Sequence, residues 1–282
     1  MEATVTTDAP RGTIHPSDRI DTSVAHPARR YNYWLGGKDN FQADRESGDA
    51  MAMAFPTIRT AALENRRFLQ RAVAQLAREA GIRQFLDIGT GIPTANNTHE
   101  VAQTVAPQSR VVYVDNDPIV LAHARALLTS SDEGATAYID ADLRDPEKIL
   151  HHPDLRRTID LSQPVALMLV AILHFVPDSD DPYAVVRRLL AELPPGSYLA
   201  ASHATYDYLP AEVAEGARAA SRGGEHGVIS LRGRDDFVRF FDGLELVEPG
   251  ITSVAEWRAG AEPQPRPTAA EVSMYGGVAR KR

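Results

Sequence analysis

The sequence predicts a doubly wound α/β fold, in which helices cover both faces of a mostly parallel sheet. Two observations support this prediction. After Gly81, short apolar runs alternate with longer segments of helical periodicity, as in a parallel sheet with crossover helices. In addition, aspartates stand at or just after the ends of three successive apolar runs. The carboxyl edge of such a sheet would bring these acids together.

A long helix is expected at 57–80, before the alternation begins. Proline is tolerated at the entry of a helix, where Pro56 stands, and glycine often ends one, as Gly81 would here. The apolar residues of this segment recur at roughly the 3.6-residue helical period: Ile58, Ala62, Leu69, Val73 and Leu76. They are therefore expected to form one buried face of the helix.

The alternation that follows contains five strands and three helices. Short apolar runs predict strands at 84–88, 110–115, 135–140, 165–171 and 197–202. The segments between them predict helices at 97–105, 118–128 and 180–193. Two later apolar runs, within 244–250 and 272–281, predict further strands on either side of an exposed Pro-rich loop at 261–270.

These elements divide the chain into three parts. Residues 1–18 are polar, contain proline and glycine and show no periodicity, so this N-terminus is predicted to be disordered. Residues 19–80 are expected to form an N-terminal helical cap or lid. Residues 81–282 are expected to form the ligand-binding core.

Composition excludes several classes of function. The 282-residue chain has no cysteine, which excludes disulfides, thiolate catalysis and cysteine-ligated zinc, and we expect no metal site. A net charge of −8 provides no basic field for nucleic acid or anionic lipid. The N-terminal segment lacks the apolar core of a signal peptide, and the longest apolar run, at 164–176, is better explained as a buried strand and its exit than as a membrane span. These features predict a cytoplasmic protein.

The segment FLDIGTGIPTANN, residues 85–97, joins the first core strand to the next helix. Gly89 and Gly91 permit backbone angles that other residues avoid, and they let a ligand lie against the main chain. The dinucleotide pattern Gly-x-Gly-x-x-Gly would need a third glycine where Thr94 stands. Asp87 occupies a position that is usually apolar in dinucleotide folds, and an acid there suits an ammonium group. We therefore expect a nucleotide site, with an ordinary strand–helix turn as the alternative.

Acids also follow the next two strands. Asp115 closes the strand at 110–115, where it could accept hydrogen bonds from both ribose hydroxyls. The alternative is an acid that caps the next helix, a role better suited to Asp117. Asp142 could accept a hydrogen bond from the exocyclic amine of adenine, beside the backbone N–H of Leu143, or it could be a solvated loop carboxylate. An ammonium, a ribose and an adenine, in this order, describe S-adenosylmethionine (SAM).

Three segments around these acids, FLDIGTGIPT, VVYVDNDP and DADLRDP, resemble the motifs of class I SAM-dependent methyltransferases. The segment PARRYNYWLGGKDNFQADRE, residues 27–46, resembles the N-terminal signature of an actinomycete branch of that class, long catalogued as a domain of unknown function. The resemblance extends from Arg19 to the C-terminus. It implies a Rossmann-like, seven-stranded sheet whose last strand, SMYGGVARK, is antiparallel. Pro93 departs from the wider class, in which many members have a third glycine there.

The aromatic segment near the N-terminus has two interpretations. Tyr31, together with Lys38 and Asn40 beyond the Gly36-Gly37 pair, could belong to a lid over the cofactor, in which aromatic faces attract the sulfonium cation. The alternative is a helix that packs on the domain and ends at the glycine pair. The family resemblance favours the lid.

His174 follows the strand at 165–171 and also has two interpretations. In plant-type O-methyltransferases, which this strand exit resembles, a histidine near this position is the general base, and imidazole titrates near neutral pH. The alternative, which we favour, is a histidine that packs against the adenine side or the core.

We therefore expect a SAM-dependent methyltransferase whose acceptor is an oxygen or nitrogen of an unidentified small molecule. A non-catalytic SAM-binding or partner-binding module and an NAD-dependent oxidoreductase are the alternatives. We expect no nucleic-acid or membrane partner, and the oligomeric state stays open. The single catalytic candidate is His174. The residues expected to bind SAM are Asp87, Gly89, Thr90, Gly91, Asp115, Asn116, Asp142, Leu143, Ala171, Tyr31, Lys38 and Asn40.

Overall fold

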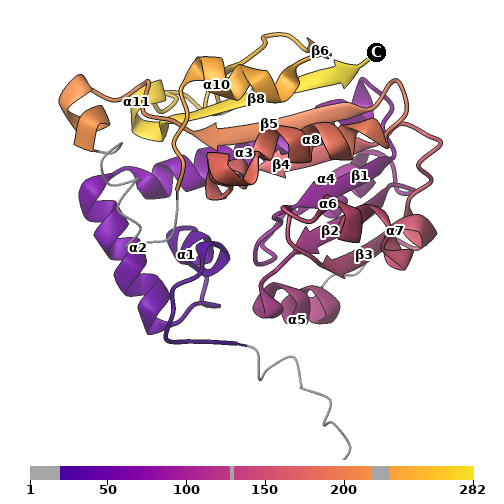
Figure 1. The fold of residues 1–282 in the computed structure, drawn as a ribbon, viewed down its shortest axis with the longest axis horizontal. Helices are drawn as coiled ribbons and strands as arrows, with labels where there is room; N and C mark the ends of the chain where they lie inside the picture. The colour runs from indigo at the N-terminus through magenta and orange to yellow at the C-terminus, as the bar shows by residue number, and fades with distance from the viewer. Residues whose placement is uncertain (1–19, 128–129, 217–228) are drawn as a thin grey trace, which may run out of the picture.

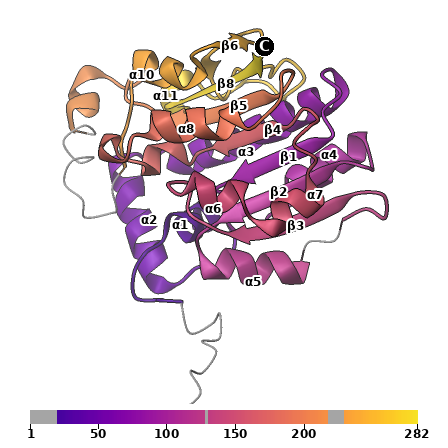
Figure 2. The same ribbon diagram turned by 45° about the vertical axis from the view of Figure 1, so that its right-hand side comes forward.

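A mixed β-sheet runs through the centre of the molecule, and helices lie against both of its faces (Figure 1, Figure 2). The computed structural model describes residues 20–127, 130–216 and 229–282. The predicted disorder of residues 1–18 lies outside these ranges. Within them, no helix combines the length and the apolar character that a membrane crossing requires.

The main path of the sheet has the strand order β3-β2-β1-β4-β5-β8-β6, and the short strand β7 pairs with β8. Neighbours among β1 to β5 are parallel, whereas β8 is antiparallel to β5, β6 and β7. The predicted doubly wound fold with an antiparallel last strand is therefore confirmed. The strands are β1 (Gln84–Ile88), β2 (Arg110–Asp115), β3 (Ala135–Asp140), β4 (Ala166–Val170), β5 (Tyr198–Ala204), β6 (Leu244–Leu246), β7 (Thr252–Ser253) and β8 (Met274–Lys281).

The helices of the described chain lie before, between and after these strands, and four of them lie close to the helices that the periodicity predicts, at 57–80, 97–105, 118–128 and 180–193. The α-helices are α1 (Pro27–Trp34), α2 (Gln42–Ala54), α3 (Ile58–Arg78), α4 (Thr98–Val105), α5 (Pro118–Leu127), α6 (Pro146–Leu150), α7 (Pro153–Thr158), α8 (Pro182–Ala191), α10 (Arg234–Val238) and α11 (Ala269–Val272). Short 3-10 helices are η2 (Leu173–Phe175), η3 (Asp178–Asp180) and η4 (Arg239–Phe241). The sequence did not predict α6, α7, α10 and α11, because elements of one or two turns are too short to show a helical period.

The two faces of the sheet pack against different helical layers. Side chains alternate between the faces along each strand, so Phe85 and Leu86 of β1 enter different apolar clusters. Phe85 packs in the cluster that contains Phe68 of α3, whereas Leu86 packs in the cluster that contains Leu155 of α7 and Val186 of α8. The core therefore consists of two layers separated by the sheet.

The helix α3 links the N-terminal helices to this core. Phe68, Val73 and Leu76 are fully buried in the same cluster as β1, β4 and β8. The ring of Trp257 packs edge-on against Phe68, with the ring centroids 5.4 Å apart. The N-terminal helices α1 and α2 lie beyond the ends of β2 and β3, on the side toward which these strands point (Figure 1). They are thus placed over the carboxyl edge of the sheet.

Candidate functional site

The carboxyl ends of β1 and β2 bring together two buried acids and a glycine turn. Asp87 lies on β1 with only 3% of its surface exposed, and the hydroxyl of Thr98 donates to its Oδ2 at 2.6 Å. Burial raises the pKa of Asp87 to about 6, against the opposing effects of the Thr98 hydrogen bond and the charge of Arg66. A carboxylate that is costly to ionise in the free protein is well suited to a cationic partner.

The two glycines of the turn have different structural requirements. Both have left-handed backbone angles, with φ of +76° at Gly89 and +66° at Gly91. A Cβ atom at Gly89 would lie 2.5 Å from Cγ1 of Ile172, so this glycine permits close packing against the exit of β4. A Cβ atom at Gly91 would meet nothing within 4 Å. Gly91 therefore opens onto free space beside the acids, while Thr90 between the two glycines is half-buried.

Asp115 at the end of β2 is tied to this turn. Its Oδ2 accepts a hydrogen bond from the N–H of Gly91 at 2.8 Å, and its Oδ1 accepts one from the N–H of Asp117 at 3.0 Å. Burial raises the pKa of Asp115, although these two backbone donors lower it. Asp117 in turn accepts from the N–H of Ile119 at 3.0 Å at the start of α5. Asp117 thus has the predicted capping role, and Asp115 remains directed at the glycine turn.

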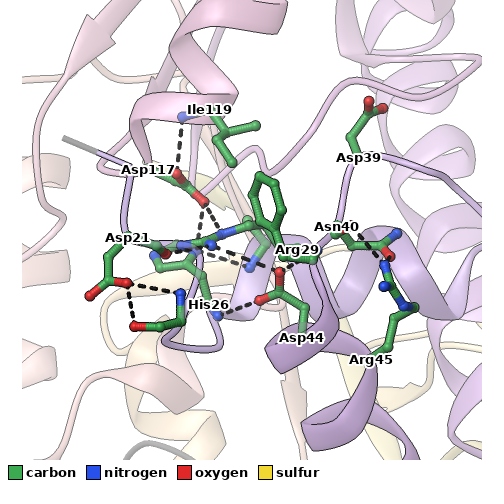
Figure 3. Close-up of polar contacts among 12 residues, drawn as sticks. Asp21, His26, Arg29, Asp39, Asn40, Asp44, Arg45, Asp117 and Ile119 are labelled. Atoms are coloured by element: carbon green, nitrogen blue, oxygen red, sulfur yellow. Dashed lines mark hydrogen bonds and ion pairs between the residues drawn. The ribbon is translucent and has the colours of Figure 1, made fainter. Parts of the chain in front are cut away.

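The carboxylate of Asp117 also anchors the N-terminal helices (Figure 3). Nδ1 of His26 lies 3.0 Å from Asp117 Oδ2, and Nε of Arg29 donates to the same oxygen at 3.2 Å. Arg29 also lies 3.8 Å from Asp44 of α2, whose other oxygen accepts from the N–H of His26 at 2.8 Å. Although burial raises the pKa of Asp117, His26 and Arg29 hold it below its usual value. We call this set of four side chains, His26, Arg29, Asp44 and Asp117, the cap clamp.

Asp142, after β3, has a more open environment. Nη2 and Nε of Arg144 donate to its carboxylate at 2.7 and 3.0 Å, and Nδ2 of Asn116 donates at 3.1 Å. These contacts, above all the Arg144 hydrogen bond, lower the pKa of Asp142. Its neighbour Leu143 is buried in the core cluster. A ligand amine would therefore share this carboxylate with Arg144.

A chain of buried hydrogen bonds connects α1 to the end of β4. The hydroxyl of Tyr31 donates to the carbonyl of Ala62 at 2.8 Å and accepts from Nδ2 of Asn65 at 3.0 Å. Oδ1 of Asn65 accepts from the hydroxyl of Ser202 at 2.5 Å, and Ser202 Oγ accepts from the N–H of Ala171 at 2.9 Å. This chain holds Ala171 in a left-handed conformation, with φ of +57°, at the carboxyl edge.

The residues around the glycine pair contact other residues of the N-terminal helices. Gly36, with φ of +80°, follows the C-cap of α1, and a Cβ atom at Gly37 would collide with the side chain of Asn32. Nδ2 of Asn40 donates to Asn32 Oδ1 at 2.9 Å. Lys38 is exposed. The glycine pair thus ends α1 in the manner of the packed-helix interpretation, and Asn40 is oriented by contacts inside the cap.

His174 is buried in η2, just beyond β4. Its Nδ1 accepts from the N–H of Ala204 at 3.4 Å, and its ring packs edge-on against His203. Burial, together with the charges of Arg232 and Arg30, lowers the pKa of His174 to about 3. The ring is therefore neutral at physiological pH. These surroundings favour a packing role over that of a general base.

A hollow of about 700 Å³ lies elsewhere on the described part of the molecule. It is lined in part by Gln84 and Arg110, which begin β1 and β2. It therefore lies at the amino edge of the sheet, opposite the acids, and ligands of open α/β sheets bind at the carboxyl edge. Among the described residues, no cluster of histidine, aspartate and glutamate could hold a metal ion.

A family model described as S-adenosyl methyltransferase matches residues 13–282. The chain belongs to the S-adenosyl methyltransferase family. The protein is thus a methyltransferase that uses SAM, and the NAD-dependent oxidoreductase considered from the sequence is excluded. The residues at the carboxyl edge fit such a ligand, because the edge holds two buried acids, Asp87 and Asp115, and open space beside Gly91, whose N–H donates to Asp115.

Solved structures agree with this assignment. The methyltransferase is 52% identical to a DUF574 family protein from Streptomyces avermitilis, with a TM-score of 0.87 over 94% of this chain and 100% of that chain. It is 44% identical to a "putative methyltransferase" from Thermobifida fusca, with a TM-score of 0.83 over 93% of this chain and 97% of that chain. The resemblance to the actinomycete branch is therefore confirmed.

More distant similarity concerns the fold alone. An O-methyltransferase family protein from Burkholderia thailandensis is 16% identical, with a TM-score of 0.51 over 85% of this chain and 62% of that chain. A search of curated proteins finds no match.

The structure adds residues to this edge that sequence reasoning missed. Asn65 belongs to the hydrogen-bond chain, and Arg66 contacts the glycine turn through Asn97. A signal was present in the sequence, since these two polar residues interrupt the apolar face between Ala62 and Leu69. A charged residue on the buried face of a helix needs a partner, and this requirement could have drawn attention to Arg66.

Proposed function

We propose that this methyltransferase binds SAM along the carboxyl ends of β1, β2 and β3 and methylates an oxygen or nitrogen of a small molecule. The observation that carries the proposal is the position of Gly91. Free space lies where its side chain would be, and the N–H of Gly91 is fixed by Asp115. A backbone that is open on one side and fixed on the other is suited to close approach by a nucleoside.

Each acid has a proposed partner on the ligand. The carboxylate of Asp87 binds the ammonium group, because its burial makes an opposite charge favourable. Asp115 accepts hydrogen bonds from the ribose, since each of its oxygens retains a lone pair beyond its backbone donor. Asp142, oriented by Asn116, lies at the adenine end with Leu143.

Further residues complete the proposed site. Thr90 lies between the two glycines, and Ala171 lines the end of β4. Tyr31, Lys38 and Asn40 belong to the cap, which the clamp and the hydrogen-bond chain hold over the same edge. We propose that this cap shields the reacting groups from water.

When bound, SAM supplies an activated methyl group on a sulfonium centre. The protein therefore has to position the acceptor and exclude water, and these two effects can provide most of the rate acceleration. His174 is neutral, and its Nδ1 already accepts from Ala204. We therefore propose that His174 shapes the site and that proton removal, where an acceptor requires it, does not depend on this ring.

A binding and transfer assay tests the proposal. The purified full-length protein is titrated with SAM, with S-adenosylhomocysteine and with NAD, and is then incubated with methyl-labelled SAM and fractionated cell extract. We expect the two adenosyl ligands to bind, NAD not to bind, and the label to enter the small-molecule fraction. Label that enters only protein or nucleic acid would contradict the small-molecule acceptor, and failure to bind either adenosyl ligand would contradict the site.

A further inference from the structure

Arg66 is a cation of α3 that faces the turn after β1. Its Nη2 donates to Oδ1 of Asn97 at 2.7 Å and lies 3.4 Å from the carbonyl of Ala95. Its Nε is buried and has no hydrogen-bond partner among the described residues. All of these acceptors are uncharged, so Arg66 forms no direct ion pair with a carboxylate of the described residues. An arginine in this state favours an anionic partner.

Asp87, an acid of the proposed site, contacts the same segment of the chain as Arg66. Asn97, which holds Arg66, is followed directly by Thr98, whose hydroxyl donates to Asp87. The positive charge of Arg66 lowers the pKa of Asp87, so the two groups are close enough to interact. They form no direct ion pair, however. A cation and an anion thus contact adjacent residues, Asn97 and Thr98, at the end of the loop that contains Gly91.

This separation of charges is complementary to a zwitterion. An α-amino acid carries an ammonium and a carboxylate on one carbon atom, and Asp87 and Arg66 present the opposite charges from neighbouring elements. We propose that Arg66 binds the α-carboxylate of the methionine part of SAM, so that Asp87 and Arg66 together select ligands with an intact amino-acid group. This inference rests on the proposed function, in which SAM occupies this edge of the sheet.

The alternative is that Arg66 only fastens the turn through Asn97 and Ala95. In that case its substitution would disturb the whole edge and weaken all adenosyl ligands alike. A carboxylate-binding role predicts a loss that depends on the ligand. Charge-assisted hydrogen bonds to a carboxylate correspond to roughly a 10- to 100-fold change in affinity.

The experiment compares four ligands by calorimetry at pH 7.5. They are S-adenosylhomocysteine, its decarboxylated analogue, its deaminated analogue and 5′-methylthioadenosine, which lacks the amino-acid group. We expect the native protein to bind S-adenosylhomocysteine about 10- to 100-fold more tightly than the decarboxylated analogue. Arg66→Gln should remove this preference and leave the affinity for 5′-methylthioadenosine within about threefold, since that ligand has no carboxylate to lose.

Three variants complete the design. Arg66→Lys keeps the charge but not the planar donor geometry, so it should retain part of the preference. Asp87→Asn should instead remove the preference over the deaminated analogue. Arg78→Gln, at the exposed C-terminal end of the same helix, is the matched control and should change no affinity.

Two results would overturn the role of Arg66. One is an unchanged preference for the carboxylate in Arg66→Gln, and the other is an equal loss of affinity for all four ligands. If Arg66→Gln does not fold, the test uses Arg66→Lys and the native protein. A native protein that binds S-adenosylhomocysteine and its decarboxylated analogue equally well would then contradict the role of Arg66. Failure of the native protein to bind any adenosyl ligand would instead contradict the proposed function.

Discussion

Arg29 and Asp117 form a buried ion pair that joins α1 to the start of α5 across 88 residues of sequence, with Arg29 Nε 3.2 Å from Asp117 Oδ2. The N–H of Asp117 donates to Asp115, the proposed ribose acid. The N-terminal helices and the proposed cofactor edge therefore share one residue, Asp117, and a change in the cap clamp should alter the affinity for the nucleoside.

Breaking the clamp should weaken both stability and ligand binding. We expect Arg29→Gln to lower the free energy of unfolding by about 2–4 kcal/mol, because removal of one partner leaves a buried carboxylate only partly compensated by His26. Affinity for S-adenosylhomocysteine should fall as well, because Asp117, whose N–H donates to Asp115, loses its contact with Arg29. Urea denaturation and calorimetry measure the two effects.

A second ion pair provides the control. Arg59 and Asp49 lie 3.8 Å apart in an exposed part of the same N-terminal region. Exposed pairs contribute little, so Arg59→Gln should leave both quantities nearly unchanged. Equal effects of Arg29→Gln and Arg59→Gln would contradict a specific role of the clamp.

Asp87 should lower the stability of the free protein. In the unfolded chain its carboxyl loses the proton near pH 3.8, whereas the folded protein retains it to about pH 6. The folded state thus binds more protons in this window, so the contribution of Asp87 to stability falls as the pH rises from about 4 to 6 and stays low above that. We expect Asp87→Asn to be more stable than the native protein by ~1–3 kcal/mol at pH 7.5.

This gain should vanish at low pH. Near pH 4, the native carboxyl is protonated in the folded protein and resembles the amide, so the difference between the two proteins should be small. Urea denaturation at both pH values measures it. A variant that is less stable than the native protein to the same extent at both pH values would show that burial of Asp87 carries no ionisation cost.

The two glycines of the turn should respond differently to alanine. Gly89→Ala places a methyl group 2.5 Å from Ile172, so we expect a loss of about 3 kcal/mol or more, or an insoluble protein. Gly91→Ala meets free space and should cost only the left-handed backbone penalty of about 1–2 kcal/mol. Its methyl group would, however, occupy the space assigned to SAM.

A measurement of ligand binding separates the backbone cost of Gly91→Ala from the loss of space for SAM. We expect Gly91→Ala to weaken S-adenosylhomocysteine at least tenfold while the protein stays folded by circular dichroism. Native affinity in a folded Gly91→Ala variant would mean that the ligand does not lie against this residue.

His174 should not control the pH dependence of methyl transfer. Its pKa of about 3 keeps the ring neutral from pH 5 to 9, so no rise in rate near pH 6.5 should belong to it. His174→Asn keeps an acceptor for the N–H of Ala204 and should retain most of kcat once an acceptor is known. A loss of kcat above a hundredfold with unchanged affinity for SAM would restore the general-base interpretation.

The sheet could be predicted from the sequence because its parallel strands are short, mostly apolar runs. The segments 84–88, 110–115 and 135–140 coincide with β1, β2 and β3. β1 and most of β2 are buried on both faces, and parallel strands of this kind leave an apolar run that can be recognised without knowledge of distant residues. Alignment of the acids along one edge followed from the same topology.

The polar contacts of the N-terminal helices could not be predicted in the same way. The pairing of Arg29 with Asp117, and of Asn65 with Ser202, joins residues far apart in sequence, and no local period encodes such contacts. The same limit applies to Arg66, whose neighbour Asn97 lies on another element. Local pattern therefore predicts the framework, whereas the polar contacts that complete the site depend on tertiary packing.

The buried hydrogen-bond chain from Tyr31 to Ala171 also limits the design of chimeras between related enzymes. A chimera that received the helices α1 and α2 of another relative would place a foreign side chain opposite Asn65. If that side chain could not complete the chain, the buried Nδ2 of Asn65 would lose its partner. An exchange of N-terminal helices that aims to change acceptor specificity would thus require Tyr31, Asn65 and Ser202 to be exchanged together.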